Sequence, residues 1–170
     1  MNHESLIDGL AENIAVFESL LTKIPEKQVC WKPAPEKWSI LEVVNHLFDE
    51  EREDFRYRLR SLLENPDKVW PPIAPEEWVL ERGYAQRNYK ASLSNFLRER
   101  EESIRWLRGL STPNWKANYR HPRLGPMSAE MILANWLAHD FLHFRQIVSL
   151  KYGYLESRAE SVSLQYAGRW

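Results

Sequence analysis

The chain of 170 residues has one cysteine, no long hydrophobic run and almost no net charge, and each scarcity excludes a class of protein. Because Cys30 stands alone, an intrachain disulfide is excluded, and no His or Asp stands near it to activate it as a nucleophile. No stretch approaches the roughly 18 uncharged apolar residues of a membrane span. The first residues lack the basic and apolar regions of a signal peptide. We therefore expect a cytoplasmic protein that binds no membrane.

Opposite charges balance almost completely, with 23 Lys and Arg against 24 Asp and Glu and a formal net charge of −1. A chain without a basic excess has no electrostatic footprint for nucleic acid, so a small molecule is the expected partner. The hydrophobic fraction of 44% and the charged fraction of 28% are typical of a globular protein. No segment has the composition of a flexible linker, and we expect residues 1–170 to form a single domain.

Apolar residues recur at helical spacing in four segments, and no segment of five or more residues shows a convincing strand alternation. Ser39 and Glu42 form a capping-box pattern at the start of the second segment, while Pro25 and Gly109 mark ends of the first and third. The sequence therefore predicts an all-α fold, a four-helix bundle. The expected helices span about residues 2–24, 39–64, 84–108 and 128–153.

The connections between these helices are long for a bundle, each exceeding about 12 residues. Such connections allow crossovers and can cover a pocket, and the proline-rich stretch 70–75 is a stiff cover of this kind. The tail, residues 154–170, has no clear period, but Leu164, Tyr166 and Trp170 suggest that it docks on the bundle. The eight tryptophans are interpreted as core anchors, a few of which can line an apolar pocket.

Two histidines of the fourth helix, His139 and His143, are four residues apart and therefore lie on one helical face. At this spacing two imidazoles can bind a single metal ion. Their face is the core-facing one, since most of its other residues are apolar. The same side of the helical wheel carries Ile132, Asn135, Trp136, Gln146 and Leu150.

A third histidine, His46, flanks the apolar stripe of Val43 and Leu47 on the second helix. Alone, it would be interpreted as a hydrogen-bonded core residue. Three inward imidazoles from two helices, however, would be costly to bury without a shared partner. We therefore predict one divalent metal ion bound by His46, His139 and His143. Three protein ligands leave a coordination position open, as in catalytic sites, and imidazole suits zinc, nickel, iron or cobalt.

Other polar residues have less certain roles. Glu50, one turn beyond His46, is the candidate proton carrier or metal-site partner, the alternative being a solvated acid in the run 49–54. Asp140 is interpreted as an ion-pair or capping residue, and Gln146 as a hydrogen-bond partner of a ligand or of a histidine, with plain packing as the alternative. His3 and His121 are assigned to the N-terminus and a loop, with pocket lining as the alternative for His121.

The chain resembles the DinB-like superfamily of four-helix metalloenzymes, which includes bacillithiol transferases. The resemblance implies a bundle with long crossovers, a metal bound at His46, His139 and His143, and in many members a dimer. Zinc or nickel are then the expected metals, with iron or cobalt as the alternatives. Three stretches of sequence carry the match: Trp38-Ser39-Ile40 with His46, Leu47 and Glu50; His121-Pro122 with Gly125-Pro126-Met127-Ser128; and His139-Asp140 with His143 and Gln146.

The resemblance also narrows the expected activity. Some members transfer small thiols onto electrophiles, so we expect a metal-dependent thiol S-transferase that acts as a homodimer on a small-molecule thiol or electrophile. Metal-dependent hydrolysis is the second enzymatic hypothesis, ranked lower because the sequence offers no convincing general base. A third hypothesis is a non-catalytic, stress-response binding module whose bundle is ordered by the metal.

Overall fold

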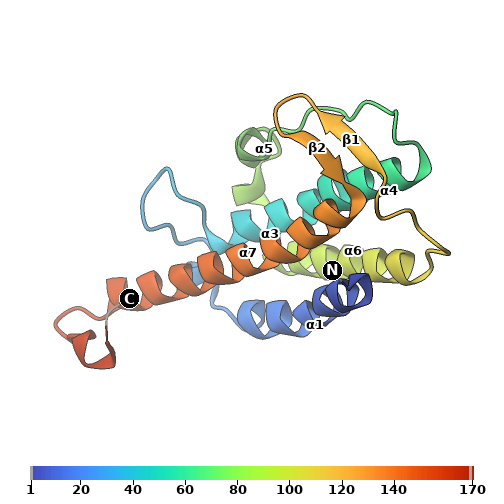
Figure 1. The fold of residues 1–170 in the computed structure, drawn as a ribbon. Helices are drawn as coiled ribbons and strands as arrows, with labels where there is room; N and C mark the ends of the chain where they lie inside the picture. The colour runs from blue at the N-terminus through green and yellow to red at the C-terminus, as the bar shows by residue number, and fades with distance from the viewer. Residues whose placement is uncertain (1, 169) are drawn as a thin grey trace.

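The computed structural model describes residues 2–168 and 170, and four long helical segments pack side by side in it (Figure 1). One segment changes from α-helix to a wider π-helical turn, η1, and back again. The predicted all-α four-helix bundle is confirmed. Its segments are α1 (His3–Leu21), α3–η1–α4 (Ile40–Asp49, Glu50–Phe55 and Arg56–Glu64), α6 (Tyr89–Arg108) and α7 (Ala129–Arg158).

Short elements occupy the long connections. The sequence analysis missed the antiparallel hairpin, in which Asn118 pairs with Ser128 and His121 with Gly125, because strands of four residues are too short to show alternation. Gly125 turns this hairpin with a φ of 75°. The short elements are α2 (Glu26–Val29), α5 (Pro75–Glu81), η2 (Tyr84–Gln86), β1 (Asn118–His121), β2 (Gly125–Ser128) and η3 (Gln165–Ala167).

Each long segment begins at a polar side chain that accepts a hydrogen bond from the backbone of the first turn. The capping box predicted at Ser39 is present, since the Ser39 backbone N–H donates to Glu42 Oε2 at 2.7 Å and the Glu42 N–H donates to Ser39 Oγ. The four capping residues are Asn2, Ser39, Asn88 and Ser128.

Helix ends follow tertiary contacts as well as local signals. The first helix ends at Leu21, earlier than predicted, and Lys23 just beyond it has a φ of 59°. The last helix continues to Arg158, past the predicted end at Gly153. A Cβ atom at Gly153 would lie 3.0 Å from the Trp31 ring, so this glycine permits close packing inside the helix and does not end it.

Two large apolar clusters form the core of the bundle, one at each end, and a third, smaller cluster consists of Trp78, Val79 and Tyr84. One large cluster gathers around Trp136 and Leu10, and the other around Phe17 and Phe96. Each long segment contributes apolar residues to both of the large clusters. Between these two sets of apolar residues, each segment carries a buried polar or charged residue. These residues are Asn13 on α1, Glu51 on η1, Arg100 on α6 and Asp140 on α7.

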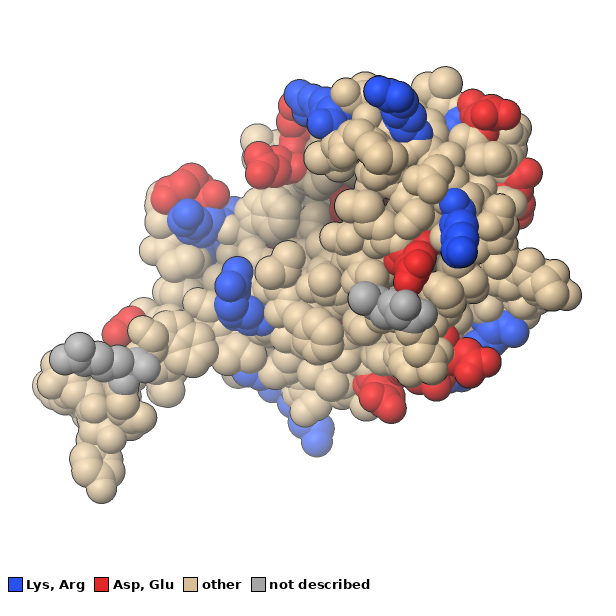
Figure 2. Space-filling model, viewed as in Figure 1, with Lys and Arg blue, Asp and Glu red and all other residues tan. Residues whose placement is uncertain are grey.

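The C-terminal tail packs against the end of α7, which projects beyond the other helices (Figures 1 and 2). Trp170 stacks on Tyr152 with ring centroids 4.6 Å apart, but Tyr166 is fully exposed and Leu164 is half-buried. The tail thus contacts the bundle where Trp170 meets α7, but Tyr166 takes no part, because the longer α7 carries the tail beyond the other helices.

Charges of both signs are interspersed over the face drawn in Figure 2, as the near-neutral composition predicts. Among residues 2–168 and 170, no helix is both long enough and apolar enough to cross a membrane.

Candidate metal centre

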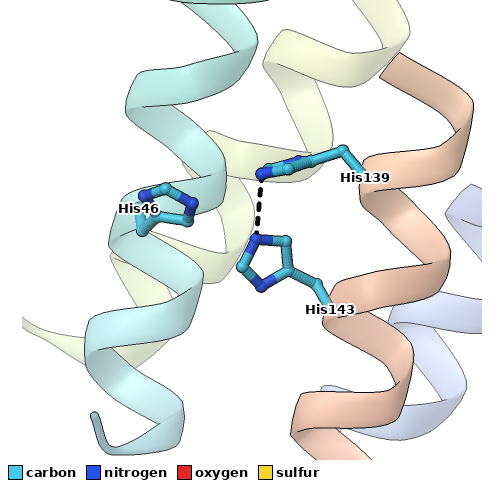
Figure 3. Close-up of side chains that lie close together, drawn as sticks. All are labelled: His46, His139 and His143. Atoms are coloured by element: carbon cyan, nitrogen blue, oxygen red, sulfur yellow. Dashed lines mark hydrogen bonds between the residues drawn. The ribbon is translucent and has the colours of Figure 1, made fainter. Parts of the chain in front are cut away.

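Three histidines from two helices converge in the interior of the bundle (Figure 3). His46 comes from α3, and His139 and His143 come from successive turns of α7. One potential ligand atom from each ring can be chosen so that all three lie within 4.8 Å of one another. The structure thus brings together the three residues that helical spacing had singled out.

The spacing of the ring nitrogens and an unpartnered nitrogen of His46 fit a shared divalent ion. Metal–nitrogen bonds of 2.0–2.1 Å place neighbouring ligand nitrogens roughly 3 Å apart, and Nε2 of His139 and Nε2 of His143 are 3.0 Å apart. The buried Nδ1 of His46 has no hydrogen-bond partner among the described residues. A buried polar atom without a partner is costly, and a cation bound by this ring would stabilise it.

Gln146 fixes the orientation of one candidate ligand. Its Oε1 lies 2.8 Å from Nδ1 of His143. With a proton on Nδ1 this nitrogen donates to Gln146, and the lone pair on Nε2 faces His139. The predicted hydrogen bond between Gln146 and a histidine is therefore present, and it favours the tautomer that binds metal.

The interior keeps the three imidazoles uncharged. Burial, and then repulsion from His143, lower the pKa of His46 to about 3. The same two causes, with smaller contributions from His46 and Arg100, lower the pKa of His139 to about 2. Burial also lowers the pKa of His143. All three rings are therefore neutral at pH 7, which is the form that coordinates a metal.

A cavity of about 1060 Å³ borders His139 and His143. The interpretation that some tryptophans line a pocket is confirmed for Trp31 and Trp38. The cavity therefore places two candidate ligands near aromatic side chains that can contact an apolar molecule, while Lys37, Arg145 and Glu156 add charge to its lining. Its remaining aromatic walls are Tyr152 and Trp170.

Glu50 lies at the start of the π-helical turn, and only 5% of its surface is exposed. In its protonated form this carboxyl donates a hydrogen bond to the neighbouring carboxylate of Asp54. Burial, and then the neighbouring carboxylate of Asp54, raise its pKa to about 8. The alternative interpretation of Glu50 as a solvated acid is therefore wrong. Because Glu50 is not among the residues that line the cavity, its role as proton carrier stays a prediction.

The raised pKa of Glu50 predicts a pH-dependent stability difference in metal-free protein. Between its ordinary value of 4.5 and about 8, folded Glu50 keeps a proton that the unfolded chain releases. As the pH rises through this window, the free energy of unfolding of the wild type should therefore fall by about 1.4 kcal/mol per pH unit relative to that of Glu50→Gln. Above the window the difference should stay constant. Urea unfolding at several pH values measures this difference. The exposed Glu64→Gln is the control, and a pH-independent difference for Glu50→Gln would contradict the assignment.

The remaining histidines lie apart from the triad. His3 is in the first turn of α1, where its ring stacks on Trp115 with centroids 4.7 Å apart. His121 ends β1, and its Nδ1 accepts backbone N–H groups at 3.2 and 3.1 Å. The assignment of His121 to a loop is therefore wrong, since it belongs to a strand, and it is not among the residues that line the cavity beside the triad.

Sequence reasoning missed a buried charge network beside the triad. Asp140 was expected in an ion pair, and it forms one with Arg100, but both side chains are almost completely buried. Glu51 binds the same guanidinium, and Asn13 donates to Asp140 at 2.9 Å. Glu51 and Arg100 stand in charged runs that resemble a solvated helix face, so neither gave a signal of its own.

Comparisons with known proteins agree with this description. The model of the DinB superfamily matches residues 10–147, a span that includes all three histidines. A solved structure, YfiT from Bacillus subtilis, matches with a TM-score of 0.78 and 19% sequence identity over 88% of this chain and 86% of that one. YfiT is described as a probable metal-dependent hydrolase with an unusual four-helix bundle topology. No curated protein matches the chain. Because the family match covers most of its length, the chain belongs to the DinB superfamily.

Proposed function

We propose that this protein is a metal-dependent S-transferase that joins a small thiol to an electrophile in the cavity beside the histidine triad. The cavity is the observation that carries the proposal, because it borders His139 and His143 and has aromatic walls. An apolar electrophile held there would lie next to the open coordination position that three protein ligands leave.

The metal and the residues have separate tasks. A divalent ion held by the three imidazoles would lower the pKa of a bound thiol, and zinc or nickel are the proposed metals, with iron or cobalt as the alternatives. Gln146 keeps Nε2 of His143 turned inward. Trp31 and Trp38 line the cavity and offer ring surfaces to an apolar electrophile.

The cavity lining favours a thiol over water as the nucleophile. Glu156 is the one carboxylic acid among the residues that line it. Glu156 is 13 residues beyond His143 on the same helix, or about 20 Å along its axis at 1.5 Å per residue. A water molecule beside the triad would therefore have no nearby general base in the lining, whereas a thiol of lowered pKa requires less help.

The proposed reaction can be written with a chromogenic aryl chloride as the electrophile. The thiol loses its proton to solvent, and a sulfur–carbon bond forms at the ring carbon. The carbon–chlorine bond breaks, and chloride leaves with the bonding electron pair. No oxidant or reductant is required.

Hydrolysis is the second candidate. It is favoured by the description of YfiT and by buried Glu50, whose pKa of about 8 suits proton transfer near neutral pH. In this alternative Glu50 would need to reach the nucleophilic water after a change in side-chain conformation. The proposed homodimer is a separate prediction, which sedimentation of the purified protein would test.

Turnover assays separate these functions. Zinc- or nickel-loaded protein is incubated with a panel of small thiols and 1-chloro-2,4-dinitrobenzene, and in parallel with a p-nitrophenyl ester without thiol. We expect thiol-dependent turnover in the wild type and in His121→Ala, and none in His143→Ala. Ester cleavage that is lost in Glu50→Gln would support the hydrolase and contradict the transferase. No turnover in either assay, together with metal-dependent stabilisation, would support the binding module.

A further inference from the structure

A group of three charged side chains lies in the centre of the bundle, with almost no access to solvent. The exposed fractions of the Arg100, Glu51 and Asp140 side chains are 1%, 1% and 0%. Arg100 Nη1 and Nη2 donate to the two carboxylate oxygens of Asp140 at 2.7 and 2.8 Å, and its Nε donates to Glu51 at 3.0 Å. One guanidinium therefore binds two carboxylates.

The hydrogen bonds indicate that both carboxylates are ionised. Asp140 also accepts from the amide of Asn13 at 2.9 Å, and Glu51 from the indole Nε1 of Trp136 at 3.0 Å. Each of these hydrogen-bond partners is a donor, which is the environment that an ionised carboxylate requires. Two negative charges and one positive charge leave this buried network with a net charge of −1.

The network adjoins the histidine triad. Asp140 directly follows His139 on α7, and Trp136 lies one turn before it. The Phe55 ring contacts both Trp136 and His139, with centroid distances of 5.7 and 5.0 Å. The excess negative charge thus lies next to the place where a dication would bind.

We infer that the Glu51–Arg100–Asp140 network supplies a fixed negative charge that strengthens divalent-cation binding at the histidine triad. Three neutral imidazoles provide ligands but no charge compensation, and a dication loses much of its hydration when it binds among them. A net negative charge nearby offsets part of that cost, and its effect is large where water is scarce. This inference rests on the proposed metal site and is independent of the thiol chemistry.

A series of isosteric variants tests the inference by changing the network charge. Asp140→Asn and Glu51→Gln each change it from −1 to 0, and the double variant changes it to +1. Zn²⁺ affinity is measured on metal-free protein by competition with a chromogenic chelator. We expect each single variant to lose about 10–100-fold in affinity and the double variant to lose more. Asp8→Asn is the control, because Asp8 belongs to an exposed ion pair with Arg108. This variant should bind Zn²⁺ with the affinity of the wild type.

Co²⁺ absorption separates charge from geometry, because its visible bands report the number and arrangement of ligands. We expect unchanged bands in every variant that retains the three histidines. Equal Zn²⁺ affinity in the wild type and both single variants would overturn the inference. So would a loss confined to Asp140→Asn with altered Co²⁺ bands, since that result indicates local positioning of His139. A wild type that binds neither ion would contradict the metal site itself.

Discussion

Replacing Arg100 by alanine is expected to destabilise the metal-free protein by about 3–5 kcal/mol, because Glu51 and Asp140 would keep their charges without the buried cation that binds both. Natural domains have total stabilities of about 5–15 kcal/mol. The variant should therefore be close to unfolding at 37 °C, with a melting temperature about 6–20 °C below that of the wild type.

Arg108 on the same helix provides a matched control. It pairs with Asp8 at 2.8 Å, but its side chain is 56% exposed. Exposed ion pairs contribute about 0–1 kcal/mol, so Arg108→Ala should be nearly neutral. Urea unfolding followed by circular dichroism compares the two variants. Similar, small losses for both would show that the buried network contributes little.

Removing every charge of the network distinguishes charge burial from lost packing. The triple variant Arg100→Met, Glu51→Gln, Asp140→Asn retains side chains of similar size and leaves no buried charge. It should recover a large part of the stability lost in Arg100→Ala, because replacing a whole buried ionic group is often neutral, whereas removing one member is not. A triple variant as unstable as Arg100→Ala would indicate that the loss arises from packing.

The triad was predictable from sequence, whereas the network beside it was not. Helical periodicity places His139 and His143 on the apolar face of their helix, and His46 lies beside an apolar stripe of its own helix. The inward orientation of each histidine could therefore be predicted from neighbouring residues alone. Glu51 and Arg100 are 49 residues apart, and their pairing depends on how α6 packs against η1. Sequence periodicity assigns charged residues to the solvent face, and only tertiary packing reverses that assignment.

The same division applies to the fold. Capping residues such as Ser39 and Ser128 mark helix starts through bonds within one turn, and the structure confirms them. The π-helical turn at Glu50–Phe55 has no local composition signal, yet it sets the direction in which Glu50 and Glu51 project. Gly153, where the helix was predicted to end, instead packs closely against Trp31, which is more than 120 residues away in the sequence.

Replacing His143 by alanine is expected to reduce Zn²⁺ affinity by about a hundredfold or more. Zinc sites with four ligands bind with about 10–16 kcal/mol, so one ligand corresponds to about 3 kcal/mol. His121→Ala is the control, because His121 lies on the hairpin outside the triad. Isothermal titration of metal-free protein measures both variants, and equal affinities would contradict the assignment of His143 as a ligand.

Thermal unfolding gives a second measure of the same site. Zn²⁺ at a hundred times its dissociation constant should stabilise the wild type by about 2.7 kcal/mol and raise its melting temperature by about 5–10 °C. At the same Zn²⁺ concentration His143→Ala should gain only about 0.4 kcal/mol. In Glu50→Gln, which lacks the carboxyl with a pKa of about 8, the Zn²⁺ affinity should also change little between pH 6 and 8, because the pKa values of His46 and His139, about 3 and about 2, keep both rings neutral throughout that range. An affinity that falls steeply below pH 7 would mean that protons compete for these nitrogens, and it would contradict a preformed neutral triad.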